Sequence, residues 1–223
     1  MSYRYFAFVD LLGYRVLIER DLRSGSSTLR EKLTASFAAL THVNDADVKL
    51  RAISDSIFIT LNNDALGFQY FAEVVRDLQI AFLKNGLLVR GGISFNEHFE
   101  NGNVTYSPAL IDAYRLESSG AFFPRVVIHD SVIEKLKNEN ELQKIIEAGL
   151  LVRHSKTFQT HIINSENWRD IYSYVKKISI DDKDVISMDP RVYAKHWYLE
   201  TYLQAFRPKG ERFFGYLDSW DIG

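Results

Sequence analysis

The stretch FVDLLGY, residues 8–14, places Asp10 at the end of an apolar run and Gly13 three residues after it. Residues 3–10 are rich in aromatic and β-branched side chains on both faces, which is typical of a buried central strand. Burying an unpaired carboxylate at the end of such a strand costs several kcal/mol. We therefore expect Asp10 to meet a partner, and a second aspartate, Asp55, stands 45 residues further along the chain.

Asp55 lies between two short apolar segments, residues 48–53 and 57–61. Only Ser54, Asp55 and Ser56 separate these segments, and such residue types favour turns. The sequence therefore predicts two strands joined in a tight hairpin, with Asp55 in the connecting turn.

Helical and strand patterns alternate along the rest of the chain. The expected order up to residue 95 is β-α-α-β-β-α-β, which fits a ferredoxin-like, split βαβ sheet. In that topology the end of the first strand lies beside the turn joining the second and third strands, so Asp10 is expected next to Asp55. The expected helices span residues 11–22, 29–42, 68–83, 107–118, 172–175 and 191–206, with more within 132–148, and the later strands span residues 87–95, 125–128, 150–153 and 160–163.

We expect one α+β domain over residues 1–223, because no repeat, low-complexity run or long linker divides the chain. Its core is expected over about residues 1–165, with extra C-terminal strands and helices and a helical extension over about residues 166–223. Three tryptophans are expected to pack in the C-terminal part: Trp168, Trp197 and Trp220.

The composition restricts the classes of function. Of the 223 residues, 46% are hydrophobic and 13% aromatic, which is enough for one well-filled core. A formal net charge of −2 gives no overall positive field for nucleic acid. The absence of cysteine excludes disulfides, zinc–cysteine sites and thiol nucleophiles. No segment reaches about 18 apolar residues, so we expect a cytoplasmic protein without nucleic-acid or membrane partners.

Two carboxylates at neighbouring strand ends repel each other unless a cation lies between them. Such oxygen ligands suit Mg²⁺ or Mn²⁺, which keep waters and substrate phosphates as further ligands. Two ions of this kind can hold the attacking and leaving oxygens of a phosphoryl transfer. Gly13 would let a triphosphate come close to the backbone, where the following helix offers its amides. In the alternative interpretation, Asp10 is only a helix cap and Asp55 only a turn residue.

Four segments, taken together, resemble the class III nucleotidyl cyclases: FVDLLGYR, LRAISDSIFIT, VRGGISF and YSPALIDAYRLESS. The first is similar to the family's first-strand metal motif, and the second to its metal-binding hairpin. More narrowly, RGGI, SPALIDAYRLE and AFFPRVVI together resemble the pyrimidine cyclases of the bacterial Pycsar anti-phage system. The resemblance covers about residues 5–130, and the C-terminal KHWYLETYLQAF matches more loosely.

The resemblance implies a metal site and a catalytic arginine. Asp10 and Asp55 would bind two Mn²⁺ or Mg²⁺ ions, with the carbonyl of Leu11 as a further ligand. Arg115 corresponds to the family's arginine that stabilises charge on the phosphate under attack. Without the resemblance, Arg115 indicates only an exposed helical ion pair with Asp112.

Three further residues would contact the substrate. Gly13 would lie against the phosphates, and Lys156 corresponds, in a poor local match, to a late triphosphate-binding lysine. Arg51 stands where purine cyclases carry a base-reading lysine, and its planar guanidinium suits a base carbonyl. The alternative for Arg51 is an ion pair with a surface acid, and Arg90 on the fourth strand is expected to form a structural ion pair.

Three departures from the family pattern argue against an ordinary purine cyclase. Ile111 stands where purine cyclases usually carry an asparagine, and Ser54 replaces the glycine usually found before the second metal-binding aspartate. Asn96 replaces the second glycine expected after the fourth strand. These departures fit the pyrimidine subfamily, whose base pocket differs.

The resemblance thus implies conversion of UTP to 3',5'-cyclic UMP and pyrophosphate. It also implies a homodimer with active sites at the interface, where one chain supplies Asp10 and Asp55 and its partner supplies Arg115. A separate effector protein would sense the product during anti-phage defence. The alternatives are a cytidylate cyclase acting on CTP, an adenylate or guanylate cyclase, a non-catalytic nucleotide-binding domain, and a ferredoxin-like protein in which both acids are structural.

Overall fold

The computed structural model describes residues 2–44, 46–62, 64–213, 215 and 217. Its strands are β1 (Ser2–Leu11), β2 (Val48–Ile53), β3 (Ser56–Leu61), β4 (Val89–Asn101), β5 (Val104–Tyr106), β6 (Val126–Ile128), β7 (Leu151–His154) and β8 (Thr157–Thr160). Its helices are α1 (Tyr14–Ser24), α2 (Thr28–Ala38), α3 (Gly67–Lys84), α4 (Pro108–Gly120), α5 (Asp130–Asn138), α6 (Leu142–Glu147), α7 (Trp168–Asp181), α8 (Lys183–Met188) and α9 (Pro190–Ala205), with a 3₁₀ turn at Asp64–Leu66.

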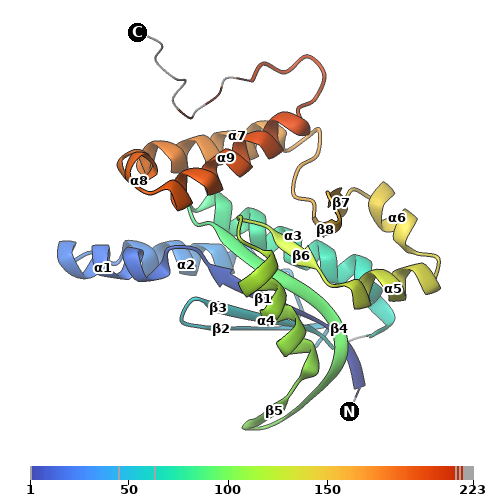
Figure 1. Ribbon diagram of the computed structural model, residues 1–223. Coiled ribbons are helices and arrows are strands. Elements are labelled where there is room, and N and C mark those ends of the chain that lie inside the picture. Colours follow the sequence, from blue (N-terminus) through green and yellow to red (C-terminus); the bar gives the residue numbers. More distant parts are fainter. Residues whose placement is uncertain (1, 45, 63, 214, 216, 218–223) are drawn as a thin grey trace.

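In the described part of the chain, eight strands form one sheet in the order β2-β3-β1-β4-β6-β8-β7, with β5 paired to β4. Strands β2, β3, β1 and β4 pair with one another in antiparallel fashion, and β6 joins the other side of β4 in parallel. This arrangement confirms the α+β fold and the ferredoxin-like order of the first four strands. Figure 1 shows α3 and α4 on opposite sides of the sheet.

Strand β1 is buried on both faces, as its composition predicts. Tyr5, Ala7, Val9 and Leu11 face the main core beneath α3, whereas Phe6 and Phe8 join Ala109 and Ala113 of α4 in a smaller cluster. Because side chains alternate along a strand, Asp10 shares the α4 face with Phe6 and Phe8. The aspartate therefore lies at the end of an apolar stripe, on the side of the sheet that α4 covers.

Two glycines let the layers of this region approach closely. A Cβ atom on Gly92 would lie 2.5 Å from the carbonyl oxygen of Ala113 and 2.6 Å from Cβ of Leu116. A Cβ atom on Gly91 would collide with the carbonyl oxygen of Phe8. The RGGI segment therefore brings α4 directly onto β4 and β4 directly against β1.

Several elements differ from the sequence-based expectation. α1 begins at Tyr14 instead of residue 11, because β1 continues to Leu11, and α2 ends at Ala38 instead of residue 42. β4 continues to Asn101 instead of ending at residue 95, because it pairs with β1 as far as His98 and with β5 beyond that point. β8 spans Thr157–Thr160 rather than residues 160–163, since pairing with Val127 and Ile128 of β6 sets its position. α7 covers Trp168–Asp181, far more than residues 172–175, because its buried side chains recur at helical spacing over this length.

The C-terminal helices α7 and α9 have their own apolar cluster, which includes Leu83 at the end of α3. Trp168 is buried as expected, and its indole N–H donates to the carbonyl oxygen of Leu203 at 2.9 Å. The expectation for Trp197 is wrong, because its side chain is 54% exposed, and Trp220 lies outside the described residues. Among the described helices, none is both long and apolar enough to cross a membrane.

Candidate active site

The end of β1 lies beside the turn between β2 and β3, as the strand order predicts. Asp10 is paired with Ser56 in the ladder, and the backbone N–H of Leu11 donates to the carbonyl oxygen of Asp55 at 2.9 Å. Ser54, at the first position of the turn, has a left-handed backbone with φ of 60°. That conformation favours glycine, and here serine adopts it in the tight turn that it forms with Asp55.

Gly13 begins the helix that follows β1. Its φ of 76° is left-handed, and a Cβ atom built there would meet nothing within 4 Å. No described side chain caps the N-terminus of α1. Just before it, the backbone N–H of Leu12 donates to the carbonyl oxygen of Leu88 at 2.9 Å. The turn after Asp10 therefore presents an open, uncapped helix N-terminus, which is favourable for an anion.

A cluster of charges surrounds the half-buried carboxylate of Asp10. Nε of Arg90 lies 3.4 Å from Asp10, and Nη2 of Arg90 lies 2.5 Å from Oε1 of Glu117. Burial raises the pKa of Asp10, the charge of Arg90 opposes this effect, and the charge of Asp55 raises the pKa further. Burial likewise raises the pKa of Glu117, with Arg90 opposing and Asp10 and Asp55 adding to the rise. Arg90 thus binds two carboxylates, and the charge of Asp55 acts on both of them.

The chemistry of these donors fits a hard divalent cation. Asp10 and Asp55 supply carboxylate oxygens, and the carbonyl of Leu11 follows directly in the chain. The described residues contain no group of three or more His, Cys, Asp or Glu side chains placed to hold a metal. A two-carboxylate site instead suits Mg²⁺ or Mn²⁺, which usually keep waters and substrate phosphates as their remaining ligands.

Arg51 lies on the same face of the sheet as Asp10. Its register partner is Phe58, which is paired with Phe8 two residues before Asp10. Arg51 and Lys49 both form ion pairs with Glu100, so the surface-acid alternative describes the observed contact of Arg51. These residues line a cavity of about 190 Å³ together with Phe6 and Phe58.

Arg115 and Lys156 are not brought to the aspartates of their own chain. Arg115 is exposed on α4, and the alternative ion pair with Asp112 is not formed, because Asp112 accepts a hydrogen bond from Asn96 at 2.8 Å. Lys156 is exposed in the turn between β7 and β8. This turn lies beyond the Ile128 end of β6, whereas Arg90 lies near the opposite end, at Val126. Ile111 is also exposed on the outer side of α4.

Sequence reasoning expects the ion pair of Arg90 but misses two other members of the cluster. Glu117 follows Ala109 and Ala113 at intervals of four residues, a spacing that indicates a buried acid in need of a cation. Lys195 on α9 is half-buried and acts electrostatically on both Asp10 and Arg90. Its own segment carries no comparable signal, because only the docking of α9 brings it to this end of the sheet.

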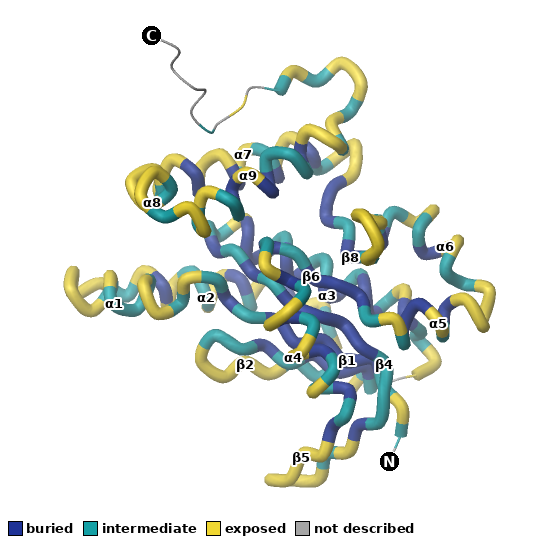
Figure 2. The backbone as a smooth tube through the Cα atoms, viewed as in Figure 1, coloured by how far each residue is buried: buried dark blue, intermediate teal, exposed yellow. Residues whose placement is uncertain are grey.

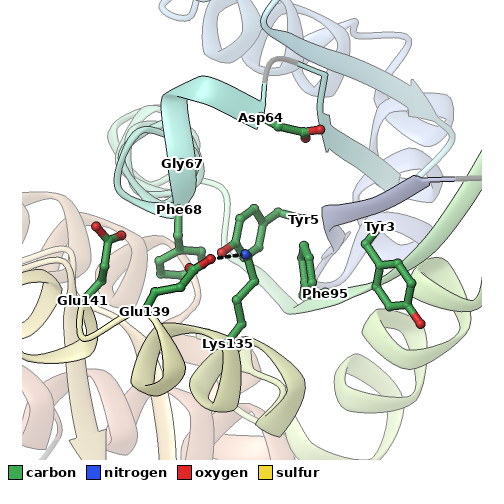
Figure 3. Close-up of a pocket in the computed structure, with 9 residues that line it drawn as sticks. All are labelled: Tyr3, Tyr5, Asp64, Gly67, Phe68, Phe95, Lys135, Glu139 and Glu141. Atoms are coloured by element: carbon green, nitrogen blue, oxygen red, sulfur yellow. Dashed lines mark hydrogen bonds and ion pairs between the residues drawn. The ribbon is translucent and has the colours of Figure 1, made fainter.

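Another cavity, of about 470 Å³, lies away from the aspartates (Figure 3). Tyr5, Phe68 and Phe95 form its aromatic walls, and Lys135 lies over the ring of Phe95, 4.8 Å from its centroid. Glu139 binds the ammonium of Lys135 at 2.5 Å. The aromatic walls are therefore already occupied by a cation of the chain itself, and none of the predicted site residues lies here.

No protein-family model and no curated protein matches the sequence. Solved structures similar to this chain include the monomeric guanylyl cyclase domain of the RhoGC fusion protein from the aquatic fungus Blastocladiella emersonii, at 13% identity and a TM-score of 0.49, covering 72% of this chain and 95% of that one. A class III adenylyl cyclase-like ATP-binding protein from Pseudomonas aeruginosa is 10% identical with a TM-score of 0.47, covering 65% and 40%. An adenylate/guanylate cyclase/hydrolase from Silicibacter pomeroyi is 13% identical with a TM-score of 0.42, covering 74% and 100%. At such identities and TM-scores, the comparisons assign neither a family nor an activity.

Proposed function

We propose that the protein is a two-metal nucleotide cyclase that converts UTP to 3',5'-cyclic UMP and pyrophosphate. The observation that supports the proposal is the pairing of the end of β1 with the β2–β3 turn, where the backbone of Asp55 is hydrogen-bonded to Leu11, the residue after Asp10. Next to them, the uncapped N-terminus of α1 offers a place for phosphates. A cation site beside an anion site is the arrangement that a metal-bound triphosphate requires.

In the proposed reaction, the ribose 3'-hydroxyl attacks the α-phosphorus of the same nucleotide. The new O–P bond forms as the bond to pyrophosphate breaks, and the hydroxyl proton passes to solvent. Divalent ions, when bound, lower the pKa of the hydroxyl and neutralise the phosphates. The carboxylates of Asp10 and Asp55 and the carbonyl of Leu11 would hold these ions. Gly13 leaves room for the phosphates, and the protein mainly positions the reacting groups.

A second copy of the chain completes the proposed site. Arg115 is exposed and cannot serve the aspartates of its own chain, but a partner packed on this side would bring its Arg115 to them. Large apolar side chains are exposed on α4 and just after it, on the β5 hairpin and at the end of β2, and Figure 2 shows β5 and parts of α4 exposed. They are Ile53, Val104, Tyr106, Ile111, Tyr114 and Phe122. Such a surface favours a homodimer interface.

Arg51 is proposed to read the base. From the strand register, the Cα atoms of Arg51 and Asp10 are roughly 12 Å apart, which is within the length of a nucleotide. Glu100 balances only one of the two positive charges of Lys49 and Arg51, so the cavity keeps a surplus positive charge. A guanidinium favours the carbonyl of uracil over the exocyclic amine that cytosine carries at the same ring position. UTP is therefore the proposed substrate and CTP the alternative.

Incubation with each of the four ribonucleoside triphosphates and Mn²⁺ tests the proposal. We expect mass spectrometry to find cyclic UMP in excess over the other cyclic nucleotides, and no product from the matched Asp55→Ala protein. Cyclic AMP or cyclic GMP as the main product would overturn the pyrimidine assignment. Absence of every cyclic nucleotide would overturn the cyclase itself.

A non-catalytic nucleotide-binding domain is the second candidate function. The engagement of Arg51 by Glu100 and the outward position of Arg115 favour it, because Arg51 is already paired and Arg115 forms no ion pair with Asp10 or Asp55 of its own chain. Calorimetric titration with Mn²⁺ and a non-hydrolysable UTP analogue separates the two functions. Binding without turnover in any oligomeric state would support the second candidate.

A further inference from the structure

The C-terminal helices border a cavity that begins at the proposed phosphate site. This cavity has a volume of about 410 Å³ and is lined by residues of α1, of the segment before β4, and of α7, α8 and α9. Leu12 and Gly13, which directly follow the metal-ligand positions, line one end. Lys195 of α9 lines the same cavity. One cavity therefore connects the β1–α1 turn with a side chain from the C-terminal part of the sequence.

Lys195 is a half-buried ammonium that has no anion bound to it. In the described part of the chain it forms neither an ion pair nor a hydrogen bond. Burial lowers its pKa, as does the charge of Arg90, whereas Asp189 and Asp10 raise it. A cation that is partly removed from water and lacks a bonded partner is costly unless an anion binds it. The nearest carboxylate of the proposed metal site, Asp10, is already held by Arg90 at 3.4 Å.

Other charged side chains also line the cavity. Arg20 and Lys32 line the cavity from α1 and α2, and Asp181 and Asp182 line it from the C-terminal helices. Of these two acids, Asp182 lies 3.7 Å from His196. Among the lining cations, Lys195 is the one whose charge acts on Asp10.

We propose that Lys195 binds the terminal phosphates of the nucleotide whose α-phosphate lies at Asp10 and Asp55. This inference rests on the proposed cyclase function and adds a substrate-binding residue to it. The phosphates would extend from the aspartates over Gly13, which has no Cβ atom to obstruct them. They would then reach Lys195 in the cavity. Lysine is suited to this role because its ammonium binds phosphate as a point charge. The C-terminal helices thereby become part of the nucleotide site.

The test compares Lys195→Ala and Lys195→Arg with the wild-type chain, with Lys177→Ala as the control. Lys177 is exposed on α7 of the same bundle and does not line the cavity. Calorimetry measures binding of a non-hydrolysable UTP analogue, inorganic triphosphate and UMP, each with Mn²⁺, and steady-state kinetics measure KM and kcat for UTP.

We expect Lys195→Ala to lose about ten- to a hundredfold in affinity for the analogue and for inorganic triphosphate, as for a hydrogen bond to a charged group. Affinity for UMP should not change, Lys195→Arg should recover most of the loss, and Lys177→Ala should match the wild type. A general structural defect would instead weaken UMP binding equally and would not be rescued by arginine.

If Lys195→Ala binds triphosphate as tightly as the wild type does, the inference about Lys195 is overturned, whereas the cyclase proposal stands. If the wild type forms no cyclic nucleotide but binds triphosphate in a Lys195-dependent manner, the cyclase proposal fails and the phosphate site stands. A wild-type chain that binds no triphosphate contradicts both.

Discussion

Asp10 is placed in an environment that disfavours its charge unless a cation binds. Burial and the charge of Asp55 together outweigh the attraction of Arg90, so the pKa of Asp10 is raised above its ordinary value of 3.8. Folding therefore favours the protonated carboxyl group, and above the raised pKa the ionised carboxylate lowers the free energy of unfolding. This cost is absent below pH 3.8, where the group is protonated in both states. A divalent ion would remove it at neutral pH.

Replacing this carboxylate with its neutral isostere should separate stability from metal binding. In metal-free buffer at pH 7 we expect Asp10→Asn to melt at or above the temperature of the wild type, with the difference vanishing below pH 3.8. Mn²⁺ with a UTP analogue should raise the Tm of the wild type but not that of the variant. Scanning calorimetry measures both effects. A variant that melts lower than the wild type without metal, yet responds equally to Mn²⁺, contradicts this role for Asp10.

At the scale of elements, the position of α4 decides where Glu117 and Arg115 lie. The helix rests on β4 at Gly92, where a Cβ atom would lie 2.5 Å from Ala113 and 2.6 Å from Leu116. Backbone and helix atoms cannot move aside without shifting the whole of α4. The glycine is therefore required by close approach of the two layers rather than by its backbone angles.

We expect Gly92→Ala to lower the free energy of unfolding by roughly 1–3 kcal/mol, the usual cost of overpacking. It should also lower cyclase activity, because α4 carries Glu117 away from Arg90. Gly120→Ala is the matched control on the same helix, since its Cβ atom would meet Leu116 at an ordinary 3.8 Å. Urea unfolding followed by circular dichroism measures the stability of both variants, and formation of cyclic nucleotide measures their activity. Equal stability of Gly92→Ala and the wild type would show that α4 does not pack as described.

The sequence predicts the elements that carry Asp10 and Asp55 because local patterns determine them. A buried strand, a turn of Ser54, Asp55 and Ser56, and the split βαβ order together specify their meeting. The position of β8 is not predictable in this way, since its pairing with β6 sets it. Lys195 is missed for a related reason. α9 reaches the site only because the C-terminal cluster packs against Leu83 of α3, a contact between residues distant in sequence.

At the scale of the whole molecule, one chain holds only part of the proposed catalytic group. Asp10 and Asp55 lie at the edge of the α4 face, and Arg115 is directed to solvent from α4. The exposed apolar side chains of this face offer a surface for a second copy of the chain. A homodimer of this kind would contain two sites, each with aspartates from one chain and arginine from the other.

Mixing two inactive variants tests this arrangement. Asp55→Ala and Arg115→Ala are each expected to lose activity, and an equimolar mixture should recover up to about a quarter of the wild-type rate. The recovery follows from random pairing, which makes half of the dimers mixed, each with one intact site. The double variant Asp55→Ala, Arg115→Ala mixed with the wild type is the control for subunit exchange. No recovery from the mixed single variants, despite demonstrated exchange, would place all catalytic groups within one chain.

The number of bound metal ions shows whether Asp10 and Asp55 hold a two-metal site. Electron paramagnetic resonance of Mn²⁺, titrated into the wild-type protein with a non-hydrolysable UTP analogue, counts the ions held at each site. We expect two ions per site for the wild type, as in other two-metal phosphoryl transfers, and loss of both in the Asp10→Asn, Asp55→Asn double variant. Equal Mn²⁺ binding by the wild type and the double variant would contradict the two-metal site.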